Sequence, residues 1–155
     1  MEIFWPIIVA VLIFIISQYI LKAVIEPVTD IKKAIGKVGE RIVAQIDLIG
    51  AGNPENIPQS RLEDLKSDFQ NMAGELAGRV SVIPKKWYSL IERIFSLPPR
   101  KHVLYACGDL AMLAHSLEGE KPSSRTKRIN KAVDITNKLQ LEWAEERIKE
   151  QKKKK

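Results

Sequence analysis

Four side chains able to carry out acid–base, nucleophilic or metal-binding chemistry lie on one predicted helix: His102, Cys107, Asp109 and His115. A cysteine nucleophile needs a base within hydrogen-bond reach. A helix turns about 100° per residue, so Cys107 and Asp109 point about 160° apart. The histidines lie thirteen residues apart without a third ligand, and no arginine stands five or six residues before either one. The sequence therefore predicts a non-enzymatic protein without cofactor or metal, in which Cys107 is a buried, inert thiol.

The lysine-rich end of the chain is a candidate site for anionic lipid or nucleic acid. Residues 125–155 hold eleven Lys and Arg residues against five Asp and Glu residues, which equals the net charge of +6. Near an anionic leaflet each lysine contributes about 1 kcal/mol, whereas binding to RNA or DNA phosphates would depend steeply on salt. A solvated end that aids solubility is the third interpretation, and nucleic-acid binding is the one we least expect. The lysines concerned are Lys149, Lys152, Lys153, Lys154 and Lys155.

Two aromatic residues next to two lysines form a second candidate, at Lys85, Lys86, Trp87 and Tyr88. Such a group could stack on nucleic-acid bases or rest on lipid headgroups. We expect a simpler arrangement, in which both aromatic side chains pack into the corner between two helices and both lysines point into solvent.

The location of all these groups depends on an uncharged segment at the N-terminus. Ile3 to Leu21 contains no charged side chain, and thirteen of its nineteen residues are Ile, Leu, Val or Phe. As a helix it would span roughly 28 Å, close to the hydrocarbon thickness of a bilayer. A cleaved signal peptide would need basic residues before the apolar run and a small-residue cleavage site, and both are missing. The sequence therefore predicts an uncleaved transmembrane anchor.

The charges on either side of the span predict its orientation. Only Glu2 precedes it, whereas Lys22, Lys32 and Lys33 follow it closely. By the positive-inside rule the N-terminus should lie outside and the rest of the chain in the cytoplasm, which makes this a single-pass protein of the inner (plasma) membrane. Ser17 and Gln18 are polar residues of the span. They could hydrogen-bond to a second copy, or lie near the boundary and contact water.

Past the span, the sequence predicts a series of amphipathic helices. Glu26-Pro27 predicts a kink, or a break and a restart, because the residue before a proline is disfavoured in helices. Ser60 and Glu63 together match the capping-box pattern of a helix start. The first helix should bury a stripe at steps of three and four, formed by Ile31, Ile35, Val38, Ile42, Ile46 and Ile49.

The next helix has a heptad-like seam. Its apolar residues alternate in steps of three and four, as in a coiled coil. The seam could pack inside one chain or between subunits. In the second case its first five residues and the two polar residues of the span form the candidate oligomer interface. The seam consists of Leu62, Leu65, Phe69, Met72, Leu76, Val80 and Ile83.

Prolines divide the rest of the domain. Ile83-Pro84 and Leu97-Pro98-Pro99 should bracket a short helix. The helix at 102–117 is apolar nearly all round, which indicates a central position, and a last helix follows Pro122. The predicted fold is all-α: a transmembrane anchor at 1–25, a cytoplasmic domain of four main helices and a short one at 26–144, and a basic tail at 145–155.

The layout resembles that of a family of small, uncharacterised bacterial single-pass proteins. The matching features are the Glu26-Pro27 exit, Ile83-Pro84 with its nearby aromatics, and the Leu97-Pro98-Pro99 connector. The resemblance implies an anchored helical domain and no activity. A second likeness is architectural: the membrane accessory proteins of RNA-targeting CRISPR systems also combine an N-terminal span with a cytoplasmic helical domain, and they assemble into pores.

Three functional hypotheses follow from the sequence. The first is a membrane-anchored, non-enzymatic interaction module that forms homo-oligomers and could also bind an unknown protein. The second is a homo-oligomeric pore-forming defence or toxin effector. The third is a membrane-tethered nucleic-acid-binding protein.

Overall fold

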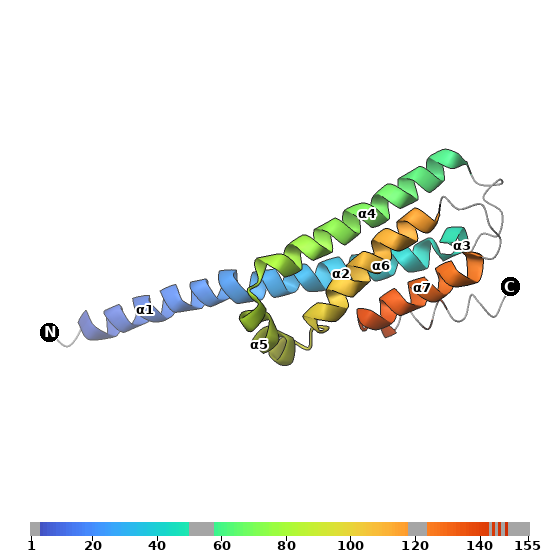
Figure 1. The fold of residues 1–155 in the computed structure, drawn as a ribbon. Coiled ribbons are helices and arrows are strands. Elements are labelled where there is room, and N and C mark those ends of the chain that lie inside the picture. The colour runs from blue at the N-terminus through green and yellow to red at the C-terminus, as the bar shows by residue number, and fades with distance from the viewer. Residues whose placement is uncertain are drawn as a thin grey trace.

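The computed structural model describes residues 4–49, 58–117, 124–142, 144, 146 and 148. Every element in these residues is helical, which confirms the predicted all-α class. One long helix projects from a bundle, and its free end carries the N-terminus (Figure 1). The elements are α1 (Phe4–Ile20), the π-helix η1 (Leu21–Ile25), α2 (Glu26–Ala44), α3 (Ile46–Ile49), α4 (Gln59–Val82), α5 (Lys85–Phe95), α6 (Arg100–Ser116) and α7 (Ser124–Lys138).

The projecting helix is long and apolar enough to cross a membrane. It runs without a break from Phe4 to Ala44, 41 residues, and its apolar window has no buried residue. Burial begins at Val28, which is 3% exposed. The long helix therefore has two parts, one that faces outward on all sides and one that belongs to the bundle.

Of the two alternatives expected at Glu26-Pro27, a kink or a break and a restart, the structure excludes the break, because the helix continues through it. The five residues of η1 form a π-helical turn, in which the Glu26 N–H donates to the Leu21 carbonyl. A proline ring crowds the carbonyl four residues earlier and donates no hydrogen bond. The wider turn accommodates Pro27 without ending the helix, and the Thr29 hydroxyl donates to the Ile25 carbonyl at 2.9 Å.

The bundle consists of α2, α4, α6 and α7, in which α4 packs against α2 and α6, and α7 packs against α6. The predicted stripe of the first helix is confirmed. Its six residues are at most 5% exposed. The helix is interrupted at Gln45, whose φ of −109° separates α2 from the short α3. Ile148, which lies beyond the predicted end of the helical domain at residue 144, is 1% exposed and belongs to the core.

Prolines set the helix starts in this fold. Pro58, Pro84 and Pro99 each take the N-cap position, with ψ between 130° and 141°. The predicted ends at Ile83-Pro84 and Leu97-Pro98-Pro99 are confirmed. The predicted capping box of Ser60 and Glu63 is wrong, because α4 already begins at Gln59 and makes no side-chain cap hydrogen bond.

Candidate functional site

The cysteine of α6 is buried and weakly nucleophilic. Cys107 is 7% exposed, and this burial raises the pKa of its thiol from 9.0 to about 11. The thiolate is the reactive form of cysteine. At neutral pH the Cys107 side chain is therefore almost entirely a protonated, apolar group of the core.

We therefore expect iodoacetamide to alkylate Cys107 at pH 8 at least about a hundredfold more slowly than a free cysteine. Mass spectrometry would measure the rate, with the denatured chain as the control. Because the native pKa is raised, the unfolded chain loses this proton first, so the thiol lowers stability as the pH rises from 9.0 towards about 11. Alkylation of the native chain at the rate of the denatured control would contradict the burial of this thiol.

Asp109 does not face Cys107 but links α6 to α7. Its carboxylate accepts a hydrogen bond from Lys138 and lies 3.6 Å from Lys131 Nζ. Lys138 also lies 2.8 Å from Asp134. The hydrogen bond to Asp109 is the main cause that raises the pKa of Lys138. These four residues form an interhelical ion-pair cluster that holds α7 on α6.

The two histidines lie far apart. His102 and His115 are both exposed on α6, and thirteen residues of helix separate them by roughly 20 Å. Among the described residues, no group of three or more His, Cys, Asp or Glu side chains is placed to hold a metal ion. The structure thus brings no two of the four candidate chemical side chains together.

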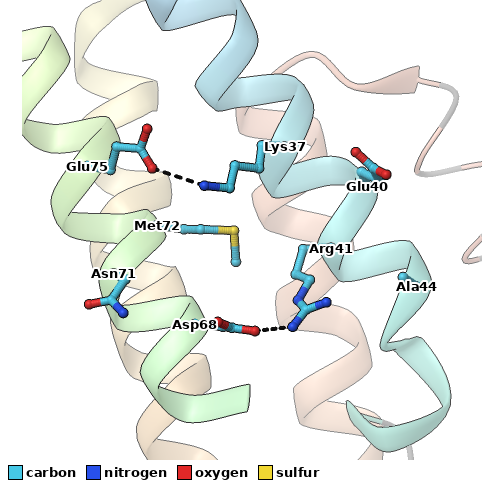
Figure 2. A pocket seen from close by; sticks show the side chains of 8 residues that line it. All are labelled: Lys37, Glu40, Arg41, Ala44, Asp68, Asn71, Met72 and Glu75. Atoms are coloured by element: carbon cyan, nitrogen blue, oxygen red, sulfur yellow. Dashed lines mark hydrogen bonds and ion pairs between the residues drawn. The ribbon is translucent and has the colours of Figure 1, made fainter. Parts of the chain in front are cut away.

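A cleft of about 480 Å³ lies between α2 and α4. Figure 2 shows the Met72 side chain pointing into it, with two ion pairs bridging the helices. Lys37 Nζ lies 3.4 Å from Glu75 Oε2, and Arg41 pairs with Asp68. The Arg79 and Lys37 hydrogen bonds hold the pKa of Glu75 below its usual value. Since both cations of the cleft contact carboxylates, an anionic ligand would have to displace one of these pairs.

The heptad seam of α4 packs within the chain. Leu65, Phe69, Met72 and Leu76 are between 0% and 5% exposed, because α2 and α6 lie against α4. Leu62 is half-buried. Of the two arrangements that the sequence allows, the structure thus shows the intrachain one, and a second copy cannot reach the four buried side chains in this fold. Ser17 and Gln18 lie exposed on α1, and their contact with a second copy stays a prediction.

The exposed face of α6 is apolar from Leu104 to Met112. Leu104 is 43% exposed, Tyr105 64% and Met112 60%. Gly108 and Ala111 lie between them on the same face, and a Cβ added to Gly108 would meet no atom within 4 Å. The central position predicted for α6 is thus only half right. One side packs on α4 and α7 while the other faces outward.

The aromatic pair of α5 is split between core and surface. Tyr88 is 1% exposed, whereas Trp87 is 57% exposed. Tyr88 packs into the corner as predicted, and Trp87 does not. Both neighbouring lysines, Lys85 and Lys86, are exposed as expected. The lysines of the predicted tail, from Lys149 onward, lie outside the described residues.

Comparisons with protein-family models, characterised proteins and solved structures gave no match. The resemblance to small bacterial single-pass proteins therefore stays a prediction. The candidate site must therefore be chosen from the structure of this chain. We choose the exposed apolar face of α6.

Proposed function

We propose that this chain is a membrane-anchored, non-enzymatic interaction module that assembles with copies of itself through the outer face of α6. The exposure of Leu104, Tyr105 and Met112 carries the proposal. Burial in a subunit interface stabilises large apolar side chains of this kind, and contiguous exposed apolar patches are typical of interaction sites.

The anchor is supported by the exposed surface of α1. Phe4 to Leu21 carries no charge, and each described residue of this segment is exposed in the single chain. Eighteen residues of helix span about 27 Å, which fits the hydrocarbon core of a bilayer. The lysines that follow the span favour a cytoplasmic bundle.

A second copy is the partner that fits this geometry. Anchoring by one span gives all copies the same orientation and depth, so the sides of their bundles meet. Helix α6 lies along the bundle beside α4 and α7 (Figure 1), and the only carboxylate between Leu104 and Met112 is Asp109, which is paired with α7. Gly108 has no Cβ and open space in front of it, so the backbones of two copies could approach closely there.

Substitution on this face should abolish self-association. We expect Tyr105→Glu/Met112→Glu to weaken it by more than about a hundredfold, because two large side chains lose their burial and two charges are desolvated. Counting of fluorophore bleaching steps in vesicles, over a range of protein-to-lipid ratios, would measure this. Gln70→Glu/Asn137→Glu, on exposed polar positions of α4 and α7, is the control for added charge and should associate normally. An unaltered chain that stays monomeric at every ratio would rule the proposal out.

A further inference from the structure

Helix α5 uses only half of its apolar surface inside the protein. Its inner stripe is buried, with Tyr88 1% and Ile91 3% exposed. A second stripe lies beside the first on the helical wheel and faces outward, formed by Trp87, Leu90 and Ile94. These three side chains are 57%, 53% and 63% exposed.

The direction of the outer stripe is fixed by polar contacts at both ends of α5. The Tyr88 hydroxyl donates to the Pro98 carbonyl at 3.0 Å. The Arg100 guanidinium donates to the Ile83 carbonyl at 2.8 Å and lies 6.0 Å from the centre of the Tyr88 ring. These bonds join the end of α4, the body of α5 and the start of α6. The inner stripe is thereby held against the bundle and the outer stripe away from it.

The outer stripe lies where the long helix leaves the bundle. In Figure 1, α5 sits at the end of the bundle from which α1 projects, level with the junction of α1 and α2. Val82, the last residue of α4, lies just before α5 and is 75% exposed. If α1 crosses a bilayer, this junction lies at the membrane surface, and so does the apolar stripe.

The charges of α5 complement an anionic surface. Lys85, Lys86 and Arg93 are exposed, and none makes an ion pair with a described residue. On the sides of the bundle, Lys37 and Lys138 are paired with carboxylates. Lys86 and Arg93 border the outer stripe on the helical wheel. Tryptophan and basic residues around an apolar stripe are typical of helices that lie in the headgroup region.

We propose that α5 lies on the leaflet from which α1 emerges, with Trp87, Leu90 and Ile94 among the acyl chains and Lys86 and Arg93 on anionic headgroup phosphates. This inference rests on the proposed membrane span of α1. The bundle then has two attachments to the bilayer, one through the long helix and one through α5. Together they restrict rotation of the bundle about the axis of α1.

The test uses the full chain with Trp5→Phe and Trp143→Phe, which leaves Trp87 as the sole tryptophan. The protein is placed at one copy per nanodisc, in phosphatidylcholine with and without phosphatidylglycerol. With phosphatidylglycerol, lipids brominated in the acyl chain should quench Trp87 emission, and acrylamide should quench it poorly. Lys86→Glu/Arg93→Glu should shift the docked-to-undocked ratio by more than about tenfold and expose Trp87 to acrylamide.

The matched control is Arg61→Glu/Lys127→Glu, which makes the same change of charge at two exposed positions near the opposite end of the bundle, and it should leave Trp87 docked. Loss of bromine quenching in Leu90→Ser/Ile94→Ser would support the apolar contact independently. The inference falls if Trp87 is unquenched by bromine and open to acrylamide in anionic discs. It also falls if Trp87 is shielded only in discs with several copies, since a protein would then cover the stripe.

Carbonate washing separates the two proposals: a chain that stays in the membrane while Trp87 is unquenched contradicts this inference alone, whereas release of the chain overturns both.

Discussion

Replacing Phe69 with alanine should lower the free energy of unfolding by about 3 to 5 kcal/mol, because the loss of a fully buried aromatic ring leaves a cavity in a close-packed core. Phe69 is 0% exposed, and it lies on the face of α4 that packs between α2 and α6. Thermal unfolding of the full chain in detergent, followed by circular dichroism, would measure the loss. A decrease in Tm of roughly 10 to 20 °C corresponds to this free energy in a domain of about 120 residues.

Val82→Ala is the matched control on the same helix. Val82 is 75% exposed, so its truncation should change the free energy of unfolding by no more than about 0.5 kcal/mol. The effect of Phe69→Ala should also be independent of protein concentration, because the seam lies within one chain. If Phe69→Ala left Tm unchanged and only shifted the protein from oligomer to monomer, the seam would lie between copies instead.

The buried faces of α2 and α4 were predictable because a helix repeats every 3.6 residues. Apolar residues at steps of three and four must form one stripe, and a stripe of large side chains is stable only when covered. This argument needs no knowledge of the partner. It identified the large buried side chains of α2 from Ile31 to Ile42 and, on α4, Phe69 and its neighbours, but it missed Val28 and the small buried residues of α2.

What covers a stripe could not be predicted in the same way. The heptad pattern of α4 is equally compatible with a neighbouring helix and with a second subunit, because the two surfaces present the same side chains. Two buried residues of α6, Leu110 and Leu113, are 0% exposed. They were indistinguishable in sequence from Leu104 and Met112, which face outward. A helix that is apolar on all sides is expected to have two contact faces. Only the folded structure shows which face packs against other helices of the same chain.

Local backbone geometry was also beyond the sequence patterns. Ser60 and Glu63 fit the capping box, but Pro58 stands two residues earlier and already has the extended conformation of an N-cap. A helix can begin at only one residue, and the sequence pattern does not show whether Pro58 or Ser60 is the stronger N-cap. At Pro27 the contacts of Val24 and Val28 with the core, one on each side of the proline, favour continuation of the helix. A single π turn therefore costs less than a break, and the propensity of the dipeptide is overridden.

The proposals on α5 and α6 both require that α1 lies in lipid. The second large expected effect is therefore the loss of membrane insertion when charges are added to α1. Twelve residues from Phe4 to Leu21 are Ile, Leu, Val or Phe. At about 0.3 to 0.6 kcal/mol each, they favour insertion by roughly 4 to 7 kcal/mol. A lysine at the centre of a span costs about 2.5 to 3.5 kcal/mol, so two of them cancel the whole driving force.

Leu12→Lys/Ile13→Lys should therefore release the chain from membranes. Both positions lie at the middle of the uncharged segment, and their side chains are 52% and 60% exposed, so the change removes no contact inside the bundle. After alkaline carbonate washing, the unaltered chain should sediment with the membranes and the double-lysine chain should appear mainly in the supernatant. Leu12→Ala/Ile13→Ala, which truncates the same side chains without adding charge, should stay in the pellet. A double-lysine chain that sediments like the alanine control would show that α1 is held by protein rather than by hydrocarbon, because only an apolar lipid environment makes those two charges so costly.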